Sequence, residues 1–306
     1  MNERPWENKN IKSANHVAEI ININFPDIEI KNIKLLGQGW DNTTWIVNKN
    51  LCFRFPKHKR AERLLSNEIN ILSNCIRSEY INTPYPKYIC SYPKSFEYIF
   101  YAHNYISGLT GDTAKLNRDN RIFIAKKLAV FLKELHSVPI ERCISLGIKR
   151  DQMNRLGFRY RYEEFKKRID FLIKKNLPNG HSKIENFYKE NMDITIPKEI
   201  RLCHGDLYSK HLIINNNDLS GIIDWGDSEL IHPAIDLAIV YQYLPKEAHS
   251  IFWNIYGEVE SNIHTIAILR AIYSSVTICW YAHQVGDISL LNEGIISLDM
   301  MSELIQ

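Results

Sequence analysis

The 306-residue sequence predicts a two-lobed α+β fold, with an antiparallel β lobe containing one helix followed by a mainly helical lobe. Short β-rich segments dominate the first part, which places the predicted lobes at residues 1–105 and 106–306. Apolar side chains recur at helical spacing in residues 122–135; they are Ala125, Leu128, Leu132 and Leu135. Residues 155–190 and 233–306 also have a largely helical pattern.

The first β-rich segment, Ile33–Val47, has the pattern strand, turn, strand, with Gly37 and Gly39 in the turn. Because glycine has no side chain, such a turn can approach a phosphate group closely. Gly-x-Gly on its own equally fits a plain hairpin turn. Leu51–Phe55 predicts the next strand, which contains Arg54.

One helix is predicted within this lobe, over Arg63–Leu72, and it carries Glu68. Its apolar residues form a single stripe; they are Leu64, Leu65, Ile69 and Leu72. Ile99–Gly108 then predicts a strand that runs into the boundary between the lobes.

Two aspartates lie in a paired motif. Residues 202–212 read LCHGDLYSKHL and residues 219–230 read LSGIIDWGDSEL, so that Asp206 and Asp224 are 18 positions apart. The Asn-rich run between the motifs is a strong turn signal, and a hairpin there would bring both carboxylates to one end of a small sheet. One carboxylate could accept a hydroxyl proton while the other holds Mg²⁺ against nucleotide phosphates, as phosphoryl transfer requires. Either motif alone would also fit a structural turn.

Together, His204-Gly205-Asp206 and Ile223-Asp224-Trp225-Gly226-Asp227 resemble the catalytic and metal-binding segments of the aminoglycoside phosphotransferase family, in its aminoglycoside 2''-kinase or macrolide kinase branch. The resemblance implies a protein-kinase-like fold, Asp206 as catalytic base and Asp224 as a metal ligand. The family most often has Asn five residues after the catalytic Asp, where this sequence has His211. A neutral imidazole can also bind a metal ion, so His211 is the expected second ligand.

The same resemblance implies a nucleotide site in the first lobe, with Mg²⁺ and either ATP or GTP. Gly37 and Gly39 would cover the phosphates, and Arg54 would contact them, with Lys57 as the competing cation. Glu68 would pair with that cation. The expected contacts to the nucleotide base come from the backbone of Asn104 and Ile106. Asp236 resembles a family residue that helps to hold the catalytic loop.

The acceptor is predicted from charge. Residues 201–306 contain 13 Asp and Glu against 4 Lys and Arg, a net charge of −9, whereas residues 1–200 contain 22 against 34, a net charge of +12. An acidic C-terminal part would attract a cationic substrate, so an aminoglycoside antibiotic is the first expectation, with resistance as the role. Its expected contacts are carboxylates, namely Asp227, Glu229, Glu258, Glu260 and Asp287.

Three alternatives remain open. A macrolide acceptor would use the aromatic residues of Trp253–Tyr256 and Trp280–Tyr281 as an apolar pocket. Choline or a sugar is also possible as the acceptor. In a different class, the chain could be a non-catalytic, kinase-like nucleotide-binding protein, although both aspartates are present.

The remaining features predict a cytoplasmic monomer that binds neither nucleic acid nor membrane. The start of the chain lacks the apolar core of a signal peptide. The nearly apolar stretch Ala271–Ala282 is too short to span a bilayer. The six cysteines are scattered without a CxxC pair and are expected to be reduced, mostly buried thiols.

Overall fold

The computed structural model describes residue 11 and residues 13–177 and 180–305. They form two compact units. Unit 1 comprises the described residues up to 77 together with 82–106 and 224–227, and unit 2 comprises 78–81, 107–223 and the described residues from 228 onward. The predicted α+β architecture, β-rich first and helical second, is confirmed. The predicted lobes were continuous in sequence, whereas unit 1 also takes the short segment 224–227 from the second half of the chain.

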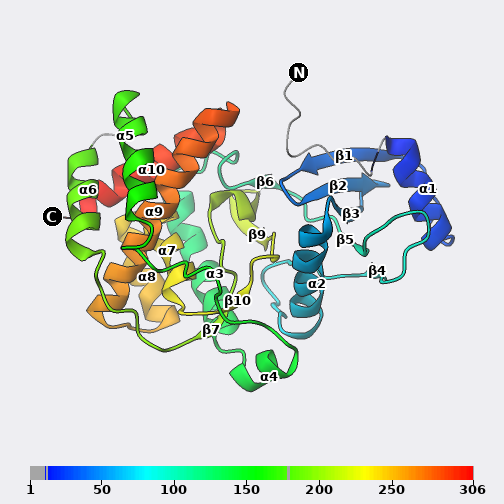
Figure 1. Cartoon of the computed structure of the whole chain (residues 1–306), viewed down its shortest axis with the longest axis horizontal. Helices are drawn as coiled ribbons and strands as arrows, with labels where there is room; N and C mark the ends of the chain where they lie inside the picture. The colour runs from blue at the N-terminus through cyan, green and yellow to red at the C-terminus, as the bar shows by residue number, and fades with distance from the viewer. Residues whose placement is uncertain (1–10, 12, 178–179, 306) are drawn as a thin grey trace. The chain divides into compact units, whose positions relative to one another are not determined.

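Unit 1 is built on one antiparallel sheet in the order β1-β2-β3-β5-β4 (Figure 1). Its strands are β1 Ile33–Gln38, β2 Asn42–Val47, β3 Leu51–Pro56, β4 Tyr88–Cys90 and β5 Phe100–Asn104. All six residues of β3 are buried, and the rings of Phe55 and Phe100 stack with their centroids 4.7 Å apart. The predicted helix is present as α2, Lys59–Asn74, which buries Leu65 and Glu68.

A second helix of unit 1, α1 (Ala14–Asn24), was missed by the sequence analysis, which placed one helix in this lobe. Ser13 caps it by accepting a hydrogen bond of 3.2 Å from the His16 backbone N–H. Val17, Ile20 and Ile21 are fully buried at helical spacing, and α1 packs against β1. The helix therefore covers one end of the apolar core of the sheet.

Unit 2 is mainly helical. Its helices are α3 Arg118–His136, α4 Ile140–Ser145, α5 Tyr162–Lys174, α6 His181–Asn191, the 3-10 helix η1 Ser209–His211, α7 Ala234–Tyr243, α8 Lys246–Tyr256, α9 Ser261–Val285 and α10 Ile288–Leu304. Its strands are β6 Leu109–Thr110, β7 Arg201–Cys203, β8 Leu212–Asn215, β9 Asp218–Ile222 and β10 Glu229–Ile231. They form two small sheets, β6-β8-β9 and β10-β7.

The predicted Asn-rich hairpin is present as β8 and β9. Asn216 and Asn217 both have positive φ, at 51° and 61°, which is the backbone of the two-residue turn that asparagine favours. The register pairs Leu212 with Ile222, and the Ile223 N–H donates to the His211 carbonyl at 3.0 Å. The hairpin thus brings the end of the first aspartate motif beside the chain that leads to Asp224.

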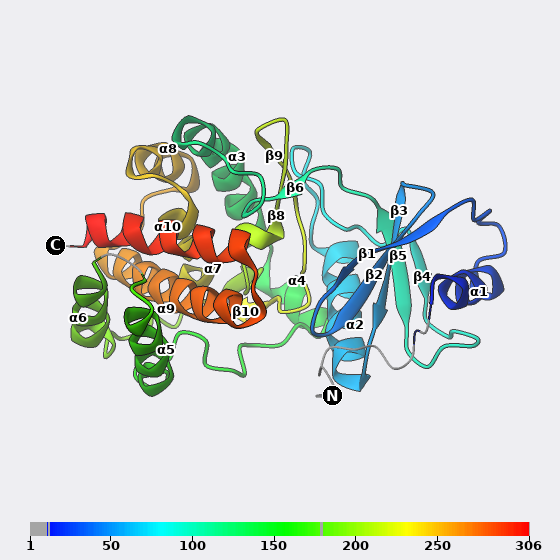
Figure 2. The ribbon, with the colours of Figure 1, turned by 90° about the horizontal axis from the view of Figure 1, so that it is seen from above.

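Helix α9 is the central helix of unit 2 and packs against α5, α7 and α10 (Figure 2). Its length and apolar composition would also allow a membrane span, but half of its apolar window is buried inside the unit. The apolar helix is longer than the predicted apolar stretch Ala271–Ala282. Its composition is accounted for by the helices that cover it.

A buried ion pair joins α3 to α10. The Arg121 guanidinium donates to both carboxylate oxygens of Glu293, at 2.6 and 2.7 Å, and to the Tyr243 carbonyl of α7 at 3.2 Å. Both side chains are more than nine-tenths buried. An exposed pair, Arg118 with Glu247, joins α3 to α8 with similar distances.

These two pairs predict different stability losses. Glu293→Gln should lower the free energy of unfolding by about 3–5 kcal/mol, because it leaves the Arg121 charge buried without its partner. Glu247→Gln, the matched control, should have a far smaller effect because water screens the exposed pair. Urea denaturation followed by circular dichroism measures both variants, and equal losses would contradict the prediction.

Candidate active site

Asp206 lies in the loop between β7 and η1, and its side chain is 41% exposed. Two neighbouring histidines hold its backbone. The Asp206 N–H donates to His204 Nδ1 at 3.3 Å, and its carbonyl accepts from His211 Nδ1 at 2.6 Å. The peptide of this residue is therefore fixed on both sides, while its carboxylate reaches the surface of unit 2.

His204 connects the Asp206 loop to the strand that precedes Asp224. Because its Nδ1 accepts the Asp206 N–H, its proton lies on Nε2, which donates to the Ile223 carbonyl at 3.0 Å. Burial lowers the pKa of His204, with His211 acting in the same direction, so the ring is neutral. Neutrality is what this arrangement needs, since a doubly protonated ring could not accept a hydrogen bond.

Asp236, on α7, binds the backbone of the same loop. Its fully buried carboxylate accepts from the backbone N–H groups of His204 at 2.7 Å and Gly205 at 2.9 Å, and from His136 Nε2 at 3.2 Å. Burial by itself would raise the pKa of Asp236, but the hydrogen bonds from His136 and from the Gly205 N–H hold it below its ordinary value. The carboxylate is therefore ionised, as a group that accepts three hydrogen bonds should be.

His211 is held through its Nδ1. Its Nδ1 must carry the proton, because the Asp206 carbonyl can only accept. In the neutral ring the lone pair is then on Nε2, and a carbonyl that fixes the other nitrogen is a usual companion of histidine ligands. The ring is buried beside Tyr208, with centroids 4.3 Å apart.

In unit 1, Arg54 on β3 joins two carboxylates. One of its guanidinium nitrogens lies 3.4 Å from Glu68 on α2 and 3.1 Å from Asp224. Burial alone would lower the pKa of Arg54, but the charges of Glu68 and Asp224 raise it above its ordinary value. Asp224 keeps a half-exposed side chain and has φ of 69°, a left-handed backbone that is uncommon for residues other than glycine.

Lys57, the competing cation, has a different partner. Its ammonium donates to the carbonyl of Gly39, and its backbone N–H donates to the Asp41 carbonyl at 2.8 Å. Lys57 therefore holds the turn between β1 and β2. The cation that meets Glu68 and Asp224 is Arg54, which favours Arg54 over Lys57 for the predicted phosphate contact.

Gly37 and Gly39 are not required by the chain around them. Neither has a positive φ, and a Cβ added at Gly37 would meet no heavy atom within 4 Å, while one at Gly39 would meet only the Asn42 carbonyl, at 3.9 Å. The space over this turn is open. Internal packing therefore does not require glycine at either position, and the turn has room for the close approach that was predicted.

Asn104 and Ile106, the two residues predicted to contact the nucleotide base, differ in their backbone hydrogen bonds. The Asn104 carbonyl already accepts from His103 Nδ1 at 2.8 Å, and burial lowers the pKa of His103 to about 4, so that this ring is neutral. Within the described part of the chain, no hydrogen bond engages the backbone of Ile106, whereas the Tyr105 N–H donates to Asn50 at 2.7 Å. Of the two predictions, the geometry favours Ile106.

Of the five carboxylates predicted to bind the acceptor, two are held in ion pairs within unit 2. Among the described residues, the one close group of three His, Cys, Asp or Glu side chains is His136, Cys203 and Asp236. Glu229 pairs with Arg155 at 3.4 Å, and Asp287 caps α10 and pairs with Lys210 at 2.9 Å. Glu258 and Glu260 are exposed in the loop before α9, and Asp227 is partly buried in unit 1.

The aromatic residues predicted to form an apolar pocket for a macrolide are packed within the protein. Phe252 and Trp253 are buried, and the rings of Phe252 and Tyr256 stack at 5.6 Å. Trp280 carries the Arg168 guanidinium on its ring, at 5.2 Å from the centroid. These aromatic side chains pack against the protein itself rather than lining an open apolar pocket.

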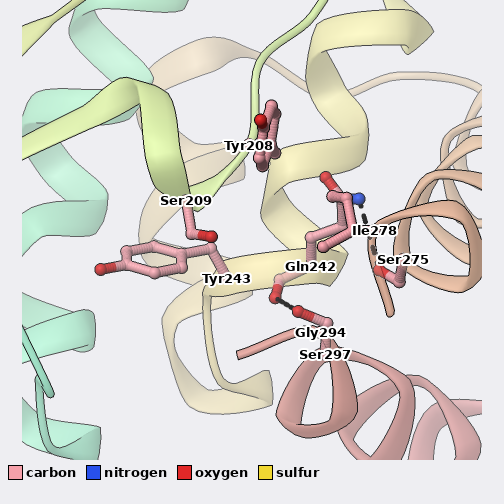
Figure 3. Close-up of a pocket in the computed structure, with 8 residues that line it drawn as sticks. All are labelled: Tyr208, Ser209, Gln242, Tyr243, Ser275, Ile278, Gly294 and Ser297. Carbon is pink, nitrogen blue, oxygen red and sulfur yellow. Dashed lines mark hydrogen bonds between the residues drawn. The ribbon is translucent and has the colours of Figure 1, made fainter. Parts of the chain in front are cut away.

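Beneath the Asp206 loop lies a small polar cavity within unit 2 (Figure 3). Tyr208 of the loop and Ser209 of η1 line it together with residues of three helices. Those residues are Gln242 and Tyr243 of α7, Ser275 and Ile278 of α9, and Gly294 and Ser297 of α10. The loop is therefore bordered by α9 as well as α7.

The contacts of His136 and the position of Arg270 near Asp206 were not predicted from the sequence. His136 had been recognised only as the end of a helix, and nothing in the sequence indicates that its ring reaches Asp236, 100 residues away. The electrostatic neighbours of Arg270 on α9 are Asp206, Arg155 and Arg161. A signal was present for Arg270, because it is the only Lys or Arg among residues 247–306.

Comparison with known proteins agrees with the fold and the motifs. The profile of the phosphotransferase enzyme family matches residues 32–262. The structure of the GDP and kanamycin complex of APH(2")-IIia is 25% identical, with a TM-score of 0.68, over 94% of this chain and 99% of that one. The GDP complex of aminoglycoside 2'-phosphotransferase-IIIa is 23% identical, with a TM-score of 0.69, over 96% and 99%. Macrolide 2'-phosphotransferase type I is 17% identical, with a TM-score of 0.59, over 94% and 98%.

The fold and the two aspartate motifs thus define a kinase-like small-molecule phosphotransferase, as the resemblance predicted. Since the family match spans most of the chain, this protein belongs to the phosphotransferase enzyme family. It is a small-molecule kinase, related in structure to both aminoglycoside and macrolide phosphotransferases.

The contacts of Asp236 predict a pH-dependent stability loss. Asp236→Asn should destabilise the chain by about 3 kcal/mol at neutral pH, because an amide NH₂ would face N–H donors. The folded pKa lies below the ordinary 3.8, so the carboxylate contributes stability above that pH and loses it as pH falls further. The difference in the free energy of unfolding between wild type and variant should therefore become smaller at acid pH. Denaturation midpoints across the acid range measure it, and a constant gap would contradict the assignment.

Proposed function

We propose that this enzyme transfers the γ-phosphoryl group of Mg²⁺-bound ATP or GTP to a hydroxyl group of a small molecule. Asp206 is the general base. The observation that carries this role is the exposed carboxylate of Asp206 on a loop whose peptide groups are fixed by His204, His211 and Asp236. A base held in this way keeps its position while remaining accessible to an acceptor hydroxyl.

The nucleotide is assigned to unit 1. The open turn at Gly37 and Gly39 can receive phosphates, and Arg54 supplies a permanent positive charge. Ile106 offers backbone groups to the base. Solved relatives hold GDP or ADP, which supports a nucleoside triphosphate as the donor without deciding between ATP and GTP.

Mg²⁺ fits the donor chemistry of Asp224. Its carboxylate is half exposed, and carboxylate oxygen is the ligand that Mg²⁺ prefers. His211 offers Nε2, a nitrogen donor that Mg²⁺ prefers less than oxygen. When bound, the ion would neutralise the charge of the phosphates.

In the reaction, the acceptor oxygen forms a bond to the γ-phosphorus while the bond from that phosphorus to the bridging oxygen breaks. The hydroxyl proton passes to the Asp206 carboxylate, and the nucleoside diphosphate leaves. His204 and Asp236 keep the loop in place and do not touch the reacting atoms. Arg54 stays charged throughout, because Glu68 and Asp224 stabilise its positive form.

An aminoglycoside acceptor has the support of relatives solved with kanamycin, gentamicin and streptomycin, and of the regional charge. Two of the five carboxylates predicted to bind it, Glu229 and Asp287, are held in ion pairs within unit 2. The general proposal of a hydroxyl acceptor does not depend on that choice. A panel of aminoglycosides, macrolides, choline and sugars tests the class directly.

Removing the base tests the reaction itself. Asp206→Ala should lower kcat by roughly 10²–10⁴-fold, because no group then accepts the hydroxyl proton. Nucleotide affinity, measured by calorimetry, should stay near the wild-type value, which controls for folding. A kcat within a few-fold of wild type would exclude Asp206 as the base.

Metal dependence tests Asp224 and His211. Asp224→Asn should raise the Mg²⁺ concentration required for half-maximal activity far more than it changes acceptor KM, since the charged ligand is lost. His211→Asn should retain most activity because an amide oxygen can replace the imidazole. If His211→Ala left metal dependence and turnover unchanged, His211 would be a packing residue only.

A further inference from the structure

Arg270 stands out among the charges of unit 2. It is the only Lys or Arg in residues 247–306, and it lies in the apolar helix α9 with a partly buried side chain. No ion pair or hydrogen bond links its guanidinium to another residue that the structure describes. A partly buried charge without a partner is costly, so a position of this kind requires a separate explanation.

A second arginine of this region, Arg161, also lacks a carboxylate partner within the described chain. It lies at the start of α5 and donates to the carbonyls of Met153 at 2.8 Å and Asn154 at 3.3 Å. Its guanidinium lies over the ring of Tyr273, 5.5 Å from the centroid, and donates to the Tyr273 hydroxyl at 3.4 Å. Tyr273 follows Arg270 by three positions on α9, so both project from one face of that helix.

The neighbouring arginines differ in this respect. Arg155 lies 3.8 Å from Asp151 and 3.4 Å from Glu229. The pairing of Arg168 with Glu164, at 2.5 Å, likewise balances its charge. Among the described residues, Arg161 and Arg270 are therefore arginines of this region whose charge no direct ion pair balances.

Arg270 lies within electrostatic reach of both Asp206 and Arg161. Burial lowers the pKa of Arg270, Asp206 opposes that effect, and the charges of Arg155 and Arg161 add to it. Independently, the cavity beneath the Asp206 loop is shared with Ser275 and Ile278 of α9 (Figure 3). Helix α9, which carries Arg270, is thus a neighbour of the loop that carries Asp206.

We propose that Arg161 and Arg270 form an anion-binding subsite beside Asp206, and that the acceptor is a small hydroxyl compound bearing a carboxylate or phosphate group. This inference rests on the proposed kinase function and specifies its acceptor. A planar guanidinium binds such anions through paired hydrogen bonds, which would orient the nearby hydroxyl toward the base. The same charges would repel the ammonium groups of an aminoglycoside.

A binding experiment tests the subsite without turnover. Inorganic sulfate is titrated at constant ionic strength in the presence of saturating Mg²⁺ and ADP, so that the phosphate positions of the nucleotide are occupied. Sulfate should raise the thermal midpoint of the wild type, because a ligand that binds the folded state stabilises it. The shift should be lost in Arg270→Gln and kept in Arg142→Gln, an exposed arginine on α4 of the same unit. An equal shift in all three proteins, or none in the wild type, would overturn the proposal.

A kinetic experiment identifies the acceptor charge. Glucose is compared with gluconate and glucose 1-phosphate, and neutral polyols with their acids and phosphate esters, alongside the aminoglycoside panel. The anionic member of a pair should be preferred, and Arg270→Gln should raise its KM at least about tenfold with a smaller effect on kcat, partly rescued by Arg270→Lys. Efficient turnover of an aminoglycoside with a KM that Arg270→Gln leaves unchanged would overturn the subsite and leave the kinase standing. If no compound were phosphorylated, the kinase proposal would fail for this panel, and the sulfate result alone would decide the subsite.

Discussion

The buried carboxylate of Asp236 is the group on which the candidate active site most depends. A charge in a protein interior is stable only when hydrogen bonds satisfy it, and here those bonds come from the backbone of His204 and Gly205 and from His136. The peptide groups that satisfy Asp236 are those that lead directly into Asp206. Since every residue of α7 is buried, the carboxylate cannot move without disturbing the core. The packing of the helical unit and the position of Asp206 therefore depend on the same contacts.

In unit 1 the buried charge is a cation, Arg54, and it is held by two carboxylates. Arg54 is buried between Glu68, which is fully enclosed, and Asp224, which is half exposed. The enclosed carboxylate fixes the cation, and the exposed one remains open to solvent and ligand. The left-handed backbone of Asp224 has a cost that persists only where its surroundings impose it, and such strain is concentrated at functional sites. The contact with Arg54 and the buried Trp225 that follows in sequence supply those surroundings.

Local chemistry explains which features could be predicted from the sequence. The hairpin follows from the turn preference of two asparagines, and the helices follow from apolar periodicity, both of which are visible within a few residues. Partners that depend on tertiary structure were not predictable in this way. Glu229 meets Arg155, 74 residues away, and Asp287 meets Lys210, 77 residues away, so two predicted ligand contacts are already engaged. The short helix α1 was missed because three buried residues leave only a weak periodic signal.

The net charge of −9 over residues 201–306 is a correct count, but it does not describe the charge of any one site. Eight of the thirteen acidic residues between 201 and 306 pair with basic or histidine side chains, most of them from earlier in the sequence. They are Asp206, Asp218, Asp224, Glu229, Asp236, Glu247, Asp287 and Glu293. These pairs cancel much of the negative charge of residues 201–306. The net charge near Asp206 therefore depends on charged side chains that are not in ion pairs. Because Arg161 and Arg270 are such side chains, the anion-binding subsite proposed for them has a charge opposite in sign to the regional total.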